Sequence, residues 1–425
     1  MSGKTFLIND RIIRIGARSR KEIKREGPQI TRNGDQNIMN ETKELISKLN
    51  TMSGSHRAVL AITGGGTEAI GSLLRHGNGS NTILEAVVPY HQNAFNEFIK
   101  GKPDKYCSIE AARSLAVSAY IRATKLTGSY EVVGVGATSS LKKDESERIG
   151  RQHQIFVAFQ NHYQTGSYAF DIVHEGKTSR EEEETFAAHQ IINVLITGFG
   201  YENTIGLLEK NLSCNCHCDV TTASPGWVDL MQDKRKLFSS MIAGDNKINK
   251  FIFPGAWNPM HSRHLEIAQK VFQLNHQRID FELCIRNIDK PPISYYDMKI
   301  REEQIRNQVQ TEPWAGNLHF TTAATFSEKA KLFPGCTFVV GMDTLLRIGD
   351  IKYYHNDEKM RFDAIEEIRK ANCRFLVFHR VINGVATTEE DTFKVPANLR
   401  ELTDLVSADI LKPCDMSSSS IRKGL

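Results

Sequence analysis

The sequence contains no long hydrophobic run, no low-complexity segment and no large excess of charge of one sign. Its longest apolar stretches, such as residues 191–199, fall well short of the ~20 residues that a membrane-spanning helix needs. The net charge is only +4, and there is no basic stripe with interleaved aromatic residues of the kind that binds nucleic acid. We therefore expect neither a membrane protein nor a nucleic-acid-binding protein.

Cysteine is also sparse, with eight in 425 residues, and the N-terminus lacks the apolar core of a secretory signal. This usage fits free thiols in a reducing compartment, so we expect a cytoplasmic protein. The first 33 residues carry nine lysines and arginines against three acidic residues. They fit a solvated basic arm or, alternatively, an organelle transit peptide, against which the acidic residues argue.

Alternating strand and helix patterns begin near residue 41, and the chain exceeds the ~300 residues at which single cores stop growing. Residues 200–248 interrupt the alternation with a Gly-rich start, a Cys-dense stretch and polar segments. We therefore predict a basic lead-in arm over 1–40, an α/β domain over 41–205, a linker over 206–248 and a second α/β domain over 249–425. In the first domain the predicted strands are 58–62, 83–90, 132–135, 154–160 and 169–173, and the predicted helices are 41–49, 67–74, 109–124 and 186–196, the last after a Ser179–Glu182 capping box.

The second domain repeats the alternation more regularly. Strands spaced by helices are typical of a parallel, doubly wound sheet, because each crossover helix returns the chain to the same edge. The predicted strands are 250–254, 279–285, 317–321, 336–341 and 373–379, and the predicted helices are 262–274, 296–307, 326–332 and 357–371.

A first motif joins the first of these strands to its helix, and it reads Gly255-Ala256-Trp257-Asn258-Pro259-Met260-His261-Ser262-Arg263-His264. Gly255 allows a tight turn at the carboxyl end of a strand, where open α/β sheets bind ligands. The following helix offers free N–H groups to phosphate. His261 and His264 are three residues apart, so they project together and can donate to phosphate oxygens, although two surface histidines would show the same spacing.

Two further motifs follow later in the chain. Gly341-Met342-Asp343 comes directly after the predicted strand 336–341, where Asp343 could hold a nucleoside or cap a helix. Met416-Ser417-Ser418-Ser419-Ser420-Ile421-Arg422 supplies hydroxyl and backbone donors and a guanidinium fork suited to phosphate. A serine-rich, frayed chain end is the alternative interpretation of this last segment.

These motifs resemble those of the nucleotidylyltransferase superfamily, whose signatures are Gly-x-Phe-[Asp/Asn]-Pro-x-[His/Thr]-x-x-His and Ile-Ser-Ser-Thr-x-Ile-Arg. The resemblance narrows towards nicotinamide or nicotinate mononucleotide adenylyltransferases. It implies transfer of AMP from ATP to a mononucleotide, with Mg²⁺ bound through the triphosphate; CTP with another phosphorylated acceptor, and a non-catalytic nucleotide sensor, remain alternatives. It implies catalysis by His261, His264 and Arg422, and nucleotide binding by Gly255, Ala256, Trp257, Asn258, Gly341, Asp343, Ser418, Ser419, Ser420 and Ile421.

The acceptor is expected beside the triphosphate, over the loop after the predicted strand 279–285. Asn287 and Lys290 lie in this loop, and Lys290 could neutralise an acceptor phosphate or be a solvated lysine. Arg301 and Arg306 fit helix-face charges. Arg263 stands where bacterial members of the family carry glycine, and this departure concerns acceptor specificity more than reaction type.

The first domain resembles the CinA C-terminal domain, a family of nicotinamide-nucleotide amidases, over residues 41–198. The matching pieces include Thr63-Gly64-Gly65-Gly66-Thr67, Tyr90 and Gly134-Val135-Gly136-Ala137-Thr138. The resemblance implies a pocket lined by Thr63, Gly64, Gly65, Tyr90 and Thr138. The family's serine position falls on Thr63 and its lysine position on Phe95, which cannot accept a proton, so we expect a binding or regulatory role without amidase activity.

Two further expectations concern metal and assembly. Cys214-Asn215-Cys216-His217-Cys218 could hold Zn²⁺ or could supply small apolar side chains to an extended segment. The spacing is closer than in known structural zinc sites, so we predict no metal site. Self-association is a possibility that the CinA resemblance alone suggests.

Overall fold

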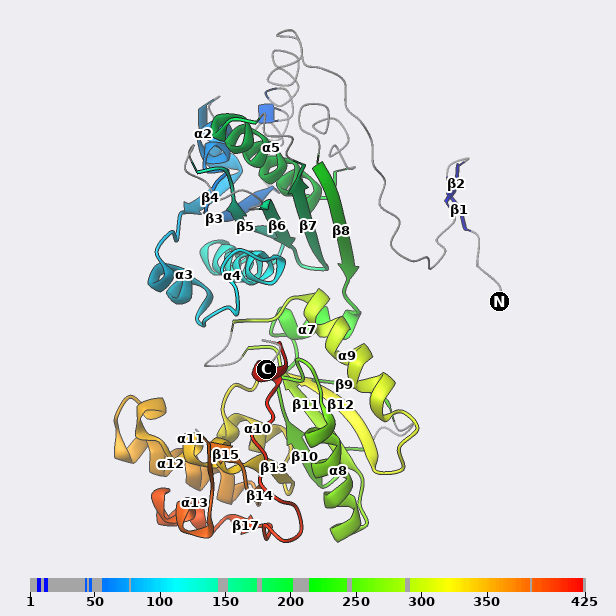
Figure 1. Cartoon of the computed structure of the whole chain (residues 1–425), viewed down its shortest axis with the longest axis vertical. Coiled ribbons are helices and arrows are strands. Elements are labelled where there is room, and N and C mark those ends of the chain that lie inside the picture. The colour runs from blue at the N-terminus through cyan, green and yellow to red at the C-terminus, as the bar shows by residue number, and fades with distance from the viewer. Residues whose placement is uncertain are drawn as a thin grey trace.

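The computed structural model describes residues 6–8, 11–13, 43, 46–47, 56–75, 78–143, 152–173, 178–201, 214–242, 247–286, 291–382 and 384–422. Two β-sheets with flanking helices make up most of this part, as Figure 1 shows. We call residues 56–222 the N-terminal unit and residues 225–422 the C-terminal unit. β1 (Phe6–Ile8) and β2 (Arg11–Ile13) form a separate antiparallel pair in the predicted arm. The predicted helix over 41–49 lies mostly outside the described residues.

The N-terminal unit is a six-stranded mixed sheet in the order β4-β3-β5-β6-β7-β8. The first three strands are parallel and the rest antiparallel. The strands are β3 (Arg57–Thr63), β4 (Ile83–Val87), β5 (Val132–Ser140), β6 (His153–Gln160), β7 (Gln164–Ile172) and β8 (Cys214–Thr222). The helices are α2 (Glu68–Arg75), η1 (Gly79–Asn81), α3 (Gln92–Ile99), α4 (Ile109–Thr127) and α5 (Arg180–Gly198).

Alternating residues of β5 explain why two long helices cover opposite faces of this sheet. Gly134 and Gly136 face α4, and a Cβ on Gly134 would lie 2.1 Å from the backbone nitrogen of Tyr120. Val133 and Val135 point the other way and pack with α5. Both helices and the Ser179–Glu182 capping box were predicted and are confirmed. The strand predicted over 83–90 ends at Val87, just before a proline that cannot donate to the ladder.

The C-terminal unit is a seven-stranded sheet in the order β17-β14-β13-β10-β11-β12-β9, parallel except for β9. Its six parallel strands follow the doubly wound order, so the predicted fold class is confirmed. The strands are β9 (Leu237–Ser240), β10 (Phe251–Pro254), β11 (Ile279–Cys284), β12 (Ala315–Thr321), β13 (Thr337–Gly341), β14 (Arg374–Phe378) and β17 (Thr403–Leu405). A short pair, β15 (Val381–Ile382) and β16 (Val385–Ala386), follows β14.

Helices and 3-10 turns connect these strands, and four of them (α8, α9, α10 and α12) were predicted within two residues at both ends. The others are short; among them, α11 directly follows β13, and α14 carries the serine cluster. They are α7 (Pro225–Met231), α8 (Ser262–Asn275), α9 (Tyr295–Val309), α10 (Phe326–Leu332), α11 (Met342–Gly349), η2 (Ile351–Tyr354), α12 (Glu358–Lys370), η3 (Glu389–Lys394), α13 (Ala397–Arg400) and α14 (Ser418–Arg422). No helix in the described ranges is both long and apolar enough to cross a membrane.

The segment over 206–248, expected as a linker, supplies structure to both units. β8 is the edge strand of the first sheet, α7 follows it, and β9 is the antiparallel edge strand of the second. An extended segment over 214–218 was one of the alternatives, but its place in the first sheet was not predicted, because most exposed positions of β8 are polar and its partly buried positions include Cys214 and Cys216 rather than large apolar residues. Cys214 and Cys216 pack against the first core.

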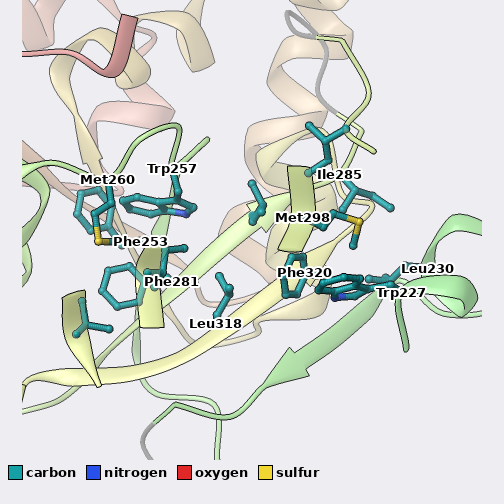
Figure 2. Close-up of a cluster of buried hydrophobic side chains, with 14 of the residues drawn as sticks. Trp227, Leu230, Phe253, Trp257, Met260, Phe281, Ile285, Met298, Leu318 and Phe320 are labelled. Carbon is teal, nitrogen blue, oxygen red and sulfur yellow. The ribbon is translucent and has the colours of Figure 1, made fainter. Parts of the chain in front are cut away.

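One apolar cluster crosses the boundary between the units. Ala119, Tyr120 and Val132 of the first unit belong to the same buried cluster as Trp227 and Leu230 of α7. Figure 2 shows Trp227 and Leu230 next to Phe320 of β12, and the rings of Trp227 and Phe320 meet edge to face at 5.4 Å. Tyr295 of α9, fully buried, donates its hydroxyl to the carbonyl of His162 in the first unit at 2.9 Å. The two units therefore share a core.

The Gly64–Gly66 turn after β3 already holds an anion that the protein itself supplies. The Gly66 N–H donates to the Glu184 carboxylate at 2.8 Å, and the Thr67 hydroxyl donates to the same oxygen at 3.2 Å. Gly64 and Gly66 both have positive φ, so the turn requires glycine at these positions. Glu184 thus ties α5 to the start of α2, where negative charge is favourable.

We predict that Glu184→Ala lowers the free energy of unfolding by about 1–3 kcal/mol, because the Gly66 N–H and Thr67 hydroxyl lose their acceptor. Urea denaturation of both proteins measures the difference. Glu181→Ala is the matched control, since Glu181 is exposed in the first turn of the same helix. Equal losses in the two variants would contradict the structural role of Glu184.

Candidate functional site

The motifs singled out in the sequence meet at one edge of the C-terminal sheet. β10 is the strand at which the strand order reverses, with β11 on one side and β13 on the other. Ligands of open α/β sheets bind in the crevice at such a switch point, beyond the carboxyl ends of the strands. The first motif leaves the end of β10, and Gly341 is the last residue of β13. The two therefore flank the crevice.

His261 and His264 lie side by side at the start of α8. His261 is the N-cap residue, and its backbone N–H donates to His264 Nδ1 at 3.3 Å. The two rings stack with centroids 3.7 Å apart. His261 is only 7% exposed, and neither of its ring nitrogens has a hydrogen-bond partner among the described residues. Buried polar nitrogens without partners are costly, so they mark a place where a ligand acceptor fits.

Both histidines are neutral in the ligand-free protein near pH 7. Burial, followed by the proximity of His261 and Arg380, lowers the pKa of His264 to about 3. Burial and Arg380 also lower the pKa of His261, which Glu266 partly opposes. Because His264 Nδ1 accepts a hydrogen bond, its proton is on Nε2, which can donate.

Trp257 fixes the loop that carries the histidines. It is 1% exposed, its Nε1 donates to the Glu282 carbonyl at 2.9 Å, and its ring meets that of His264 at 4.9 Å. A Cβ on Gly255 would lie 2.5 Å from the Trp257 ring, so only glycine fits there. Arg301 of α9 donates to the Ala256 carbonyl at 3.1 Å. Arg301, expected as a helix-face charge, therefore holds this loop through a hydrogen bond.

Arg380 follows β14 and connects the three motifs. Its Cγ would lie 3.1 Å from a Cβ at Gly341, its Nε is 3.9 Å from Asp343 Oδ1, and its Nη2 donates to the Met416 carbonyl at 3.3 Å. The Nε is buried and makes no hydrogen bond within the described ranges. Asp343 lies in the first turn of α11, whereas the N-cap is Gly341, so the predicted capping role of Asp343 is wrong.

The serine motif lies against the first motif. Ser418 donates to the Pro259 carbonyl at 2.8 Å, and Ser420 Oγ lies 2.8 Å from Ser417 Oγ. Arg422 donates to the Asn258 carbonyl through Nη1. Ile421 is 38% exposed, and the side chain of Ser419 lies outside the described residues.

Arg263 of the first motif contacts the segment that leads into the serine motif. It is 5% exposed, and its guanidinium donates to the Lys412 carbonyl in the segment that leads into the serine motif, and to Glu266 at 3.0 Å. The departure from glycine at this position thus has a structural role.

A cavity of about 200 Å³ opens beside the first motif. At its wall the Lys329 ammonium donates to the Glu282 carboxylate at 2.5 Å, and both side chains are almost fully buried. Burial raises the pKa of the Cys284 thiol to about 11, so this cysteine is neutral near pH 7. The lining residues are Pro254, Gly255, Ala256, Glu282, Cys284, Ala324, Thr325, Phe326, Lys329, Thr344, Arg347, Ile348, Tyr353 and Tyr354.

Asn287 and Lys290, predicted to bind the acceptor, lie outside the described residues. Arg306 remains on the face of α9, where it donates to Glu302 at 3.1 Å and to the Met241 carbonyl at 3.0 Å. This position agrees with the helix-face prediction.

The residues predicted to line a pocket in the N-terminal unit have structural contacts there. Thr63 and Thr138 are opposite one another in β3 and β5, and Thr138 donates to the Tyr106 carbonyl at 2.9 Å. Gly64 and Gly65 belong to the turn packed near Glu184, and Tyr90 is 70% exposed. Phe95, which the resemblance placed at a lysine position, is 2% exposed and packs edge to face on Tyr106.

The cysteine cluster forms part of β8, so its side chains alternate between the two faces of the sheet. Among the described residues, no group of three or more His, Cys, Asp and Glu side chains is arranged to hold a metal ion.

Two charged residues near the motifs were missed from sequence: Arg380, and Asp104, which contacts Arg422 from the N-terminal unit. A third, Arg301, was expected only as a helix-face charge. A basic residue directly after the strand over 373–379 was a signal for Arg380, because all parallel strands end at the same edge. Nothing in the sequence near Asp104 points to a contact with the chain end.

No protein-family model matches the sequence, and no curated protein matches it. Among solved structures, the chain is similar to a competence-damaged protein (CinA) superfamily protein from Klebsiella pneumoniae 700603, with 10% identity, 38% of this chain and 98% of that chain covered, and a TM-score of 0.28. It is also similar to competence damage-inducible protein A from Klebsiella pneumoniae subsp. pneumoniae MGH 78578, with 14% identity, 40% and 96% coverage and a TM-score of 0.27.

The low pKa of His264 makes stability depend on pH. An unfolded chain has a histidine pKa of 6.5, so between pH 6.5 and about 3 it binds a proton that the folded protein excludes. The free energy of unfolding therefore falls as the pH is lowered through this window, by on the order of 2 kcal/mol between pH 6.5 and 5.

We predict that His264→Asn, which retains an acceptor for the His261 N–H, shows a correspondingly smaller decline. Urea denaturation at pH 6.5 and at pH 5 measures the difference for each protein. An identical decline in the wild type and the variant would rule out a buried, neutral His264.

Proposed function

We propose that the C-terminal unit transfers AMP from ATP to nicotinamide or nicotinate mononucleotide and releases pyrophosphate. The observation that carries this proposal is the buried His261 imidazole, whose two nitrogens lack partners in the described part of the chain, at the start of α8. His264, Arg380 and Arg422 surround the same loop end. Neutral and cationic donors gathered at a helix N-terminus suit a triphosphate.

The chemistry needs no protein nucleophile. A phosphate oxygen of the mononucleotide attacks the α-phosphorus of ATP in line, the new P–O bond forms, and the bond from the α-phosphorus to the oxygen bridging to the β-phosphate breaks. That electron pair leaves with pyrophosphate. Mg²⁺ bound to the triphosphate would neutralise charge on the departing pyrophosphate.

The protein would act by position and electrostatics. His264 Nε2–H and His261 can donate to the α- and β-phosphate oxygens as their charge increases. Arg380 follows β14, and its buried Nε, 3.9 Å from Asp343, supplies a further donor. Arg422, which donates to the Asn258 carbonyl, would add a cationic donor for the leaving phosphates.

The cavity beside Gly255 and Ala256 is our proposed site for the mononucleotide. Phe326, Tyr353 and Tyr354 give it aromatic walls, against which a pyridine ring can pack. Because it adjoins the first motif, an acceptor bound here would present its phosphate towards the α-phosphorus.

For the N-terminal unit we propose a binding or supporting role without amidase activity. Phe95 fills the core at the position of the family's base, so the Thr63 hydroxyl has no lysine there to activate it. Glu184 occupies the Gly66 N–H that would otherwise be available to a phosphate.

The function is tested by incubating the protein with Mg²⁺, ATP or CTP, and nicotinamide or nicotinate mononucleotide, and measuring pyrophosphate and dinucleotide. We expect product with ATP, and His261→Ala to lower kcat by on the order of 10²–10³. His276→Asn is the matched control, because His276 caps the far end of the same helix with positive φ, which asparagine tolerates.

Other results of this assay would indicate another function. Turnover with CTP alone would indicate a cytidylyltransferase. Binding of nucleotide without turnover would indicate a sensor. The absence of both binding and turnover with every combination of triphosphate and mononucleotide would contradict the proposal.

Arg380→Gln provides a second, independent prediction. Removing its charge from the crevice should lower kcat/KM for ATP by on the order of 10²–10³, as for other charge-stabilising donors. Arg374→Gln is the control, since Arg374 starts the same strand at the opposite edge and pairs with Asp404 at 2.8 Å. Equal activity of the two variants would exclude Arg380 from the site.

A further inference from the structure

The arginine of the serine motif is held by the other unit. Arg422 donates through Nε to Asp104 Oδ2 at 2.5 Å, and its Nη2 is 3.5 Å from Asp104 Oδ1. Asp104 lies in the loop over residues 100–107, between α3 and α4 of the N-terminal unit. Figure 1 shows the C-terminal end of the chain at the junction of the two units.

This loop is firmly attached on its own side. The Tyr106 carbonyl accepts from Thr138, the Tyr106 hydroxyl donates to Asn96 at 3.1 Å, and Ser108 caps α4 through the Ala111 N–H. Asp104 is therefore two residues from an anchor and reaches across to Arg422. It is also the one acidic residue in residues 100–107, which contain three lysines.

The Asp104 carboxylate binds the same part of Arg422 that a triphosphate would bind. Asp104 takes the Nε and Nη2 edge of Arg422, which is the two-donor edge that a phosphate group also uses. A phosphate cannot occupy this edge while the carboxylate remains there. Two anions close together repel one another, so binding of one disfavours the other.

We propose that Asp104 and the bound triphosphate compete for Arg422, so that the loop over residues 100–107 is a latch that nucleotide binding opens. The latch rests on the proposed function for the triphosphate, but the contact itself is present without nucleotide. Through the Asp104–Arg422 ion pair, the latch links the N-terminal unit to the site of the C-terminal unit. The conformation of the first unit can thereby set the affinity of the second for nucleotide.

The first test is the dissociation constant for Mg·ATP, measured by calorimetry on the full chain. Asp104→Asn keeps the shape and removes the charge, and should tighten binding about two- to five-fold, the size expected for an exposed ion pair. Asp363→Asn is the control for net charge, since Asp363 is exposed on α12. Unchanged or weaker binding in Asp104→Asn, relative to this control, would overturn the latch.

A second readout separates the latch from the enzymatic proposal. Hydrogen exchange of the peptide covering residues 100–107 should become faster in Asp104→Asn and in Arg422→Gln without any nucleotide, and in the wild type when Mg·ATP is added. Slower exchange on addition of Mg·ATP would show that the loop closes on the nucleotide and would overturn the latch. If the wild type binds no Mg·ATP, the proposed function fails, and the ligand-free exchange result still shows whether Asp104 holds the loop.

Discussion

The relative position of the two units depends on the apolar cluster that crosses between them. Tyr120 and Val132 from the first sheet region and Trp227 and Leu230 from α7 are buried in one cluster with the core of the second sheet. Burying each such side chain stabilises the folded protein by about 1.5–3 kcal/mol. An exposed ion pair contributes only about 0–1 kcal/mol. The shared core therefore fixes the geometry, and the contact of Asp104 with Arg422 follows from it rather than causing it.

Within the C-terminal unit, the doubly wound strand order determines which residues lie next to one another. Parallel strands bring the ends of β10, β13 and β14 to one edge, so residues far apart in the sequence become neighbours. Arg263 then ties the chain before the serine motif to α8 by donating to the Lys412 carbonyl. As a result His261, Arg380 and Arg422 lie near one another, and His261 and Arg380 carry buried nitrogens without a hydrogen-bond partner among the described residues.

Much of this arrangement was predictable, and the rest was not for physical reasons. Hydrophobic periodicity identified β10, α8 and α4, because each buries large apolar side chains at regular spacing. It did not place β8, whose partly buried positions include two cysteines, in the first sheet, and it missed the short helix α11. The motif residues were found from their order along the chain, whereas Asp104 pairs with Arg422 only through tertiary structure. The glycine-rich turn over 64–66, predicted to line a pocket, instead binds the Glu184 carboxylate, and this contact too depends on tertiary structure.

The central claim is that the His261 imidazole receives a phosphate of a nucleoside triphosphate. Imidazole ¹⁵N resonances, assigned with His261→Asn and followed while Mg·ATP is added, test it most directly. The account predicts that the His261 signals shift on saturation and that its pKa, lowered by burial and Arg380 in the free protein, rises because the phosphate charge favours the protonated ring. Unchanged His261 signals and pKa at saturating Mg·ATP would contradict it.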